Sequence, residues 1–352
     1  MKSFDYLRPA TIAEAVAAAS QPGAAYLAGG TNLLDLMKGG ITQPRVLVDI
    51  NRLPGLDAIE HLPDGGARIG ARVRNSDLAH DTAFARRFPA AAEALLSGAS
   101  AQLRNAATVA GNLLQRTRCA YFYDVASACN KRQPGAGCEA RGGDTRTHAV
   151  LGWSESCIAT NPSDFCVPLV AFDAVVEIVG KSGRREVPLE SFHRLPGDTP
   201  ERESVLEPGD LIIAVRLPAE ASEFAPHARY LKVRERTSYA FAVVSAAAAL
   251  RIEAGAIAEA RIALGCVALK PWRARAAEAV LVGARPDGAA FRRAAEVALA
   301  DATPSGDNEF KIKLARRIVT RTLALAAVGT PNRVPALPAS PFAPVPGALV
   351  HA

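Results

Sequence analysis

The stretch Ala24-Ala-Tyr-Leu-Ala-Gly-Gly-Thr-Asn-Leu33 leads an apolar strand through two adjacent glycines into a new apolar segment. At such a turn, backbone N–H groups can converge on a pyrophosphate because no side chains stand in the way. A Gly-Gly pair after a strand is also typical of a plain turn. The chain has no G-x-G-x-x-G and no G-x-x-x-x-G-K-S/T pattern, so neither a Rossmann dinucleotide site nor a P-loop is indicated.

Helices and strands are expected on both sides of this turn. Thr11-Ile-Ala-Glu14 has a capping-box pattern, which predicts a helix to Ala19. In the last helix, Phe310, Leu314 and Ile318 recur at helical spacing and should face a core, while basic residues from Lys311 to Arg321 should form a solvated face. Apolar patterns predict strands at 24–28, 46–50, 67–71, 174–179, 211–217, 242–252 and 260–269, and helices at 33–37, about 75–79, 90–97 and 308–327.

Length and composition indicate a globular protein of two or three domains, since 352 residues with 49% hydrophobic content can bury a sizeable core. The longest apolar run, 240–250, falls well short of the roughly 20 residues needed to cross a bilayer. The net charge of +6 comes with only 6% aromatic residues, so nucleic-acid binding is not expected. The N-terminus has no export signal, so the default compartment is the cytoplasm, and the alternative is the periplasm by co-export with a signal-bearing partner.

The pattern of elements changes near residue 220 and divides the chain. We expect an α+β protein with an α/β domain over 1–220, in two subdomains of about 1–55 and 56–220. An α+β domain should follow over 221–328. Six prolines are found beyond Gly329, so residues 329–352 are expected to form an extended tail.

Four of the six cysteines fall in one polar segment, with the spacing C-x9-C-x8-C-x18-C: Cys119, Cys129, Cys138 and Cys157. Four thiolates in a loop-rich segment suit an iron–sulfur cluster or a structural zinc. A reducing compartment disfavours disulfides, and structural zinc sites usually contain C-x2-4-C pairs, so the spacing favours iron–sulfur. His148 is expected at the surface, and Cys166 and Cys266 in the core.

Two further motifs follow the glycine turn in order: Gln102-Leu-Arg-Asn-Ala-Ala-Thr-Val-Ala-Gly-Asn-Leu113 and Pro162-Ser-Asp164. Together the three motifs resemble the FAD-binding subunits of the xanthine dehydrogenase and carbon monoxide dehydrogenase family of molybdenum hydroxylases. The resemblance covers roughly residues 1 to 327. It implies a two-subdomain FAD-binding domain of the PCMH type, followed by a C-terminal domain of the CO dehydrogenase flavoprotein type.

The resemblance also implies which residues bind FAD, and it assigns no catalytic side chain. Asp164 would bind ribose or adenosine hydroxyls, Leu211 or Ile212 would line the adenine end, and Lys232 would lie near the isoalloxazine, with Tyr239 as a neighbour of the flavin edge. The pyrophosphate loop would comprise Leu27, Ala28, Gly29, Gly30, Thr31, Asn32 and Leu33, and the second loop would contribute Thr108, Gly111 and Asn112.

An insertion over 116–160 departs from the ordinary family pattern. It resembles that of periplasmic aldehyde oxidoreductases in this family, in which, as in 4-hydroxybenzoyl-CoA reductase, a subunit of this type holds a [4Fe-4S] cluster. The resemblance makes Cys119, Cys129, Cys138 and Cys157 the ligands. Because the FAD loops flank the insertion, we expect loss of the cluster to leave much of the FAD site intact.

These inferences predict an oxidoreductase subunit that carries FAD and a [4Fe-4S] cluster in a heteromeric molybdenum-dependent aldehyde oxidoreductase. Electrons would come from separate molybdenum-cofactor and [2Fe-2S] subunits and pass through FAD to an external acceptor. One alternative is the equivalent subunit of a 4-hydroxybenzoyl-CoA reductase-like enzyme working in the opposite direction. Another is a zinc-stapled structural or binding module.

Overall fold

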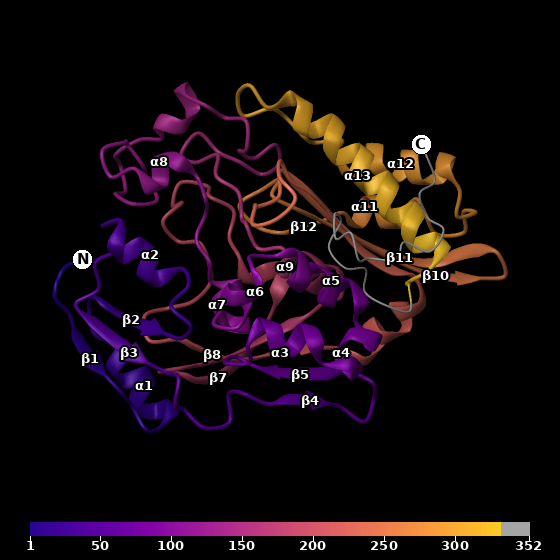
Figure 1. The fold of residues 1–352 in the computed structure, drawn as a ribbon. Coiled ribbons are helices and arrows are strands. Elements are labelled where there is room, and N and C mark those ends of the chain that lie inside the picture. Colours follow the sequence, from indigo (N-terminus) through magenta and orange to yellow (C-terminus); the bar gives the residue numbers. More distant parts are fainter. Residues whose placement is uncertain (332–352) are drawn as a thin grey trace.

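Three β-sheets follow one another in the computed structural model, which describes residues 1–331 (Figure 1). Most of the predicted Pro-rich tail, from residue 332 on, lies outside the described residues. Among the helices of residues 1–331, none is both long and apolar enough to cross a membrane.

The N-terminal sheet is parallel, with strand order β1-β3-β2. The Thr11 hydroxyl accepts a hydrogen bond from the Glu14 amide at 3.2 Å, so the predicted cap begins the first helix. The glycine turn joins β2 to α2, as the sequence indicated. The elements are β1 (Asp5–Leu7), α1 (Ile12–Ala19), β2 (Ala24–Leu27), α2 (Leu33–Lys38) and β3 (Val46–Asp49).

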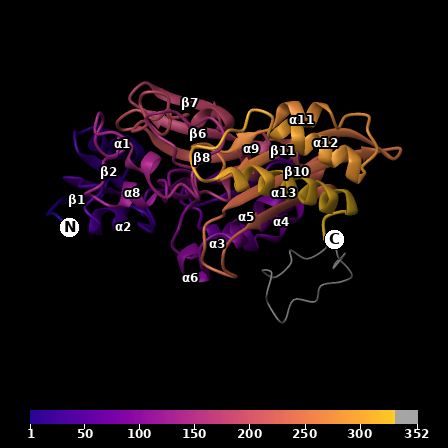
Figure 2. The ribbon, with the colours of Figure 1, turned by 90° about the horizontal axis from the view of Figure 1, so that it is seen from above.

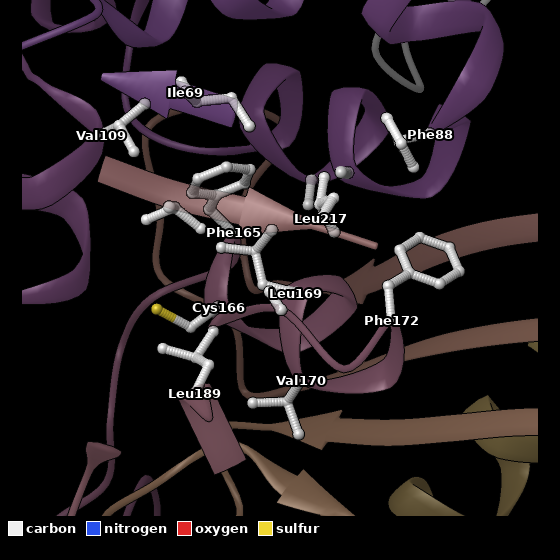
Figure 3. Packing of buried hydrophobic residues seen from close by; sticks show 14 of the residues in the cluster. Ile69, Phe88, Val109, Phe165, Cys166, Leu169, Val170, Phe172, Leu189 and Leu217 are labelled. Atoms are coloured by element: carbon white, nitrogen blue, oxygen red, sulfur yellow. The ribbon is translucent and has the colours of Figure 1, made fainter. Parts of the chain in front are cut away.

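The second sheet is antiparallel, with strand order β4-β5-β8-β6-β7, and helices pack on one of its faces. Figure 3 shows Ile69 of β5 and Leu217 of β8 close to Phe165 and Leu169 in the same buried cluster. The strands are β4 (Ile59–His61), β5 (Ala67–Gly70), β6 (Val175–Gly180), β7 (Gly183–Pro188) and β8 (Leu211–Leu217). The helices are α3 (Asn75–His80), α4 (Thr82–Arg87), α5 (Pro89–Ser97), α6 (Ala101–Arg104), α7 (Val109–Leu113), α9 (Cys166–Ala171) and α10 (Leu189–Phe192).

The C-terminal sheet has strand order β12-β11-β10-β9 and is covered by α12 and α13 (Figure 2). Ile318 is buried against this sheet, and Phe310 and Leu314 pack beside it, as their spacing predicted. The elements are a 3-10 helix at Ala219–His227, β9 (Ala228–Val233), β10 (Val244–Glu253), β11 (Ala256–Gly265), β12 (Trp272–Arg273), α11 (Arg275–Ala279), α12 (Gly288–Ala298) and α13 (Glu309–Val328).

The inserted segment 116–160 contains only α8 (Ala120–Tyr123) and a short 3-10 helix at Glu139–Gly142. Phe122 and Cys129 pack against Leu36 of α2 at one end of the segment. At the other end, the Asn308 amide donates to the carbonyls of His148 and Ala149 at 3.1 and 3.2 Å. The insertion is therefore held between α2 and the start of α13.

Lys311 was predicted to lie on the solvated face of α13. This prediction was wrong, because the Lys311 side chain is fully buried. Its ammonium donates to the carbonyls of Thr147, His148 and Cys266 at 3.0, 2.6 and 2.9 Å. Three donors thus meet three backbone acceptors that lie in irregular structure. Burial lowers the pKa of Lys311 to about 8.

Lys311 is expected to make the folded state more stable as the pH rises from about 8 towards 10.5, the ordinary lysine pKa. In that window the unfolded chain binds more protons at this position than the folded chain. Relative to Lys311→Met, the wild type should gain on the order of 2–3 kcal/mol of unfolding free energy over the window. Urea unfolding at pH 8 and pH 10 measures this difference. The exposed Lys313→Met is the matched control, and parallel pH profiles for Lys311→Met and wild type would contradict the prediction.

Candidate functional site

A cleft of about 590 Å³ lies where the glycine turn, the helices α5 to α7 and the loop 235–243 meet. This volume is in the usual range for cofactor sites. Several residues predicted to bind FAD line it together: Thr31, Asn32, Gly111, Asn112 and Asp164. The three sequence motifs therefore converge on one cavity.

The glycine turn packs tightly against the second loop. A Cβ added at Gly29 would lie 2.0 Å from the carbonyl oxygen of Ala106, a distance that only glycine avoids. Gly30 has a φ of +71°, a backbone conformation that residues with a Cβ rarely adopt. The Asn51 amide donates to the Ala28 carbonyl at 2.9 Å and anchors the start of the turn. Both glycines are thus required by the backbone path that forms this wall of the cleft.

The second loop is joined to the Pro162-Ser-Asp164 motif. The Thr108 hydroxyl accepts from the Gly111 amide at 3.2 Å and so caps the N-terminus of α7. The side-chain oxygen of Asn112 accepts from the hydroxyl of Ser163 at 2.7 Å and from the amide of Gln115 at 2.8 Å. These bonds fix the Asn112 side chain at the cleft.

Asp164 lies at the cleft, and both of its carboxylate oxygens have partners. The Lys232 ammonium is 2.7 Å from one oxygen, and the Tyr230 hydroxyl donates to the other at 2.5 Å. Burial, together with this carboxylate, raises the pKa of Tyr230 well above its usual value. The side chain of Lys232 is 4% exposed and also donates to the Ser97 carbonyl at 3.1 Å. Lys232 therefore holds Asp164 in place.

Among the described residues, the other predicted FAD residues do not line this cavity, apart from Tyr239. The side chains of Leu211 and Ile212 on β8 are buried in the core at 3% and 2% exposure. Leu27 packs beside Gly30, since a Cβ there would be 3.4 Å from a Leu27 methyl carbon. Tyr239 lines the cleft with a φ of +50° and is exposed.

Part of the cleft wall comes from the insertion, which sequence reasoning did not place there: Thr117, Arg118, Cys119, Thr147, His148 and Thr160. Asn32 of the glycine turn accepts from the Arg116 amide at 2.9 Å and donates to the Tyr123 hydroxyl at 3.4 Å. The Arg118 guanidinium lies 4.5 Å from the Phe241 ring centroid. The insertion and the predicted FAD loops therefore line the same cleft, so we now expect loss of the cluster to affect FAD binding more than the flanking position of the loops indicated.

Cys119, Cys129, Cys138 and Cys157 line a second, smaller cavity, here called the cysteine cavity. Cys119 also lines the large cleft, so the two cavities share a wall. In residues 1–331, no group of three or more His, Cys, Asp or Glu side chains is arranged to hold a metal ion. Cys166 and Cys266 are buried, as predicted.

Burial shapes the chemistry of the thiols. It raises the pKa of Cys119 to about 11 and that of Cys157 to about 12, although Lys131 acts in the opposite direction on Cys157. At neutral pH these groups are therefore thiols in the metal-free chain. Binding of a metal would have to release their protons.

A buried charge cluster lies beside the cysteine cavity. Lys131 lines the cavity and is 2.8 Å from Glu203, which Arg116 also contacts at 2.6 Å. Burial raises the pKa of Glu203, but Lys131 and Arg116 outweigh that effect and hold it below its usual value. Two cations around one carboxylate leave an excess positive charge next to the thiols.

His148 is buried at 4% exposure, so the prediction of a surface position was wrong. Its ring nitrogen Nε2 lies 3.2 Å from the sulfur of Cys119. Burial lowers the pKa of His148, and the neighbouring Lys311 adds to this effect. The sequence offered no signal for this contact, because 28 residues, most of them outside helices and strands, separate His148 from Cys119.

Two protein families and several known proteins match most of the chain. Residues 2–220 match the family model described as the FAD binding domain in molybdopterin dehydrogenase, and residues 229–326 match the CO dehydrogenase flavoprotein C-terminal domain. The aldehyde oxidoreductase FAD-binding subunit PaoB of Escherichia coli K12 is 50% identical over 93% of this chain and 99% of its own length. The carbon monoxide dehydrogenase medium chain of Hydrogenophaga pseudoflava is 28% identical over 92% and 96%.

A solved structure shares the fold. It is the carbon monoxide dehydrogenase from Hydrogenophaga pseudoflava that lacks the Mo-pyranopterin moiety of the molybdenum cofactor. That chain is 29% identical, with a TM-score of 0.72 over 93% of this chain and 98% of its own length. The predicted fold class is therefore confirmed.

Proposed function

Because this chain belongs to the family of FAD-binding subunits of molybdenum hydroxylases, we propose that it is the electron-transfer subunit of a heteromeric aldehyde oxidoreductase and carries both FAD and a [4Fe-4S] cluster. The observation that carries the proposal is the pair of cavities that share Cys119. We assign residues 1–220 to FAD binding, with the insertion 116–160 for the cluster, and residues 221–328 to a second domain. When bound, FAD would supply the redox chemistry that links the metal centres to an external acceptor.

The residues at the cleft fit FAD. Thr31 and Asn32 of the glycine turn line the cleft, which puts the backbone of this turn within reach of a pyrophosphate bound there. In this proposal, residues 27–33 wrap the pyrophosphate, and Thr108, Gly111 and Asn112 form the opposite wall. Asp164 accepts hydrogen bonds from hydroxyl groups of the cofactor, while Lys232 and Tyr230 orient it. Leu211 and Ile212 have buried side chains, so any contact with adenine would come from their backbone.

The residues at the cysteine cavity fit an iron–sulfur cluster. The four cysteines surround a cavity. In a [4Fe-4S] cluster each of them would bind one of the four iron atoms through its thiolate. A zinc ion would need all four sulfurs about 2.3 Å from one point. Lys131 and Arg116 add positive charge beside a cluster whose thiolate ligands are anionic.

Further chains complete the enzyme in this proposal. A relative named as a medium chain is one subunit of a larger enzyme. We infer that this chain assembles with a molybdenum-cofactor subunit and a [2Fe-2S] subunit, because its own cysteines lack the plant-type C-x4-C-x2-C spacing. No observation favours the 4-hydroxybenzoyl-CoA reductase-like alternative over this one.

The proposal predicts the cofactors of the complex purified without oxygen. Acid precipitation should release about one FAD per chain, since no covalent flavin link is expected. Iron should exceed the amount that the [2Fe-2S] partner holds by about four per chain, without stoichiometric zinc. Flavin fluorescence of the supernatant and metal analysis provide the measurement. One zinc per chain, with all iron accounted for by the partner, would favour the zinc-stapled alternative.

A further inference from the structure

His148 lies at the wall between the two cavities and touches the one cysteine that lines both. We propose that His148 is a positioning residue that donates its Nε2–H to the sulfur of Cys119 and raises the reduction potential of the bound cluster. This inference rests on the proposed function, which assigns the cluster to the cysteine cavity.

The direction of the hydrogen bond follows from the chemistry of the two groups. A metal-bound thiolate has no proton and can only accept, so the proton must lie on Nε2, 3.2 Å away. The other ring nitrogen, Nδ1, is buried and has no hydrogen-bond partner within residues 1–331. Nothing among the described residues therefore holds the proton on Nδ1.

The imidazole is also held in place through its backbone. The His148 amide donates to the Thr145 carbonyl at 2.9 Å, and its carbonyl accepts from Lys311 at 2.6 Å and Asn308 at 3.1 Å. The Tyr121 ring lies beside the imidazole, with centroids 6.3 Å apart. The hydrogen bonds fix the backbone of His148, and the Tyr121 ring limits the space beside the imidazole. Together they keep the Nε2–H directed at the sulfur.

A hydrogen bond from His148 to the Cys119 sulfur would change the reduction potential of the cluster. An N–H directed at a ligand sulfur withdraws negative charge from it and stabilises the more negative, reduced state. The contact also falls on the cleft side, because His148 lines the cleft together with Cys119. The ligand nearest the proposed flavin is therefore the one that receives this donor.

The test compares two substitutions in the complete complex, with the cluster signal followed by electron paramagnetic resonance during a redox titration. His148→Leu removes the donor and should lower the midpoint potential. His148→Gln places an amide N–H near the Nε2 position and should restore most of the wild-type potential. Tyr121→Phe keeps a ring beside the imidazole and removes only a hydroxyl that accepts from the Asp144 amide at 2.7 Å, so it should leave the potential unchanged.

The outcomes separate this inference from the proposed function. A His148→Leu complex with full iron and an unchanged potential would overturn the role of His148. If His148→Leu loses iron, the glutamine variant decides: full iron at the wild-type potential supports the donor role, and loss of iron or a lowered potential refutes it. A wild-type complex without the additional iron contradicts the proposed function itself.

Discussion

Gly29→Ala is expected to remove most of the FAD from this chain. The new Cβ would lie 2.0 Å from the Ala106 oxygen, so the glycine turn and the second loop would have to separate. Overpacking of this kind costs about 1–3 kcal/mol, which corresponds to a loss of affinity on the order of ten- to a hundredfold. The measurement is the FAD dissociation constant of the deflavinated complex, determined by fluorescence quenching for the variant and for the wild type.

Gly288→Ala is the matched control for this substitution. Gly288 begins α12, and a Cβ there would meet only the flexible end of Arg292 at 3.3 Å. The control should bind FAD like the wild type. If Gly29→Ala keeps its helical circular dichroism signal and wild-type FAD affinity, the glycine turn does not bind the cofactor.

Cys138→Ser is expected to lower the content of both iron and FAD. Cys138 lines the cysteine cavity but not the cleft, so a direct effect on FAD is excluded. Loss of one thiolate would leave an open iron site prone to loss, and the insertion has little core of its own to replace the metal. Because Thr117, Cys119 and His148 line the cleft, a loosened insertion should weaken FAD binding by at least about fivefold, as coupled sites do.

Iron per chain and the FAD dissociation constant are measured on the same sample. Cys166→Ser is the control, since Cys166 is buried in the core of the second sheet beside Phe165 (Figure 3). It should keep its iron even if it lowers stability. Full iron in Cys138→Ser would refute the ligand assignment, whereas iron loss with unchanged FAD affinity would show that the FAD site stays intact without the cluster.

Local patterns predicted the regular elements well where burial was continuous. The strand at Leu211–Leu217 is buried along nearly its whole length, so its apolar run was unambiguous. Strand β7, with the sequence Gly-Arg-Arg-Glu-Val-Pro, was not predicted because it lies at the edge of its sheet and is mostly exposed. Its pairing with β6 depends on tertiary context and not on an apolar pattern.

The polar parts of the site were harder to predict. Thr31, Gly111 and Asp164, one from each of the three motifs, line the same cleft. The burial of Lys311 and His148 could not be predicted, because backbone carbonyls from distant loops and a single sulfur satisfy them. A sequence shows which groups need partners, but not which loop supplies them.

The Lys311 ammonium joins carbonyls of the insertion to the carbonyl of Cys266, directly after β11. Deleting the C-terminal region would therefore leave Thr147 and His148 without their donor, although both lie in the portion matched by the FAD-binding model. The boundary between the two family models is accordingly not a place to divide the gene. A fragment that ends near residue 220 would lack Lys311, whose hydrogen bonds hold Thr147 and His148 at one wall of the cleft.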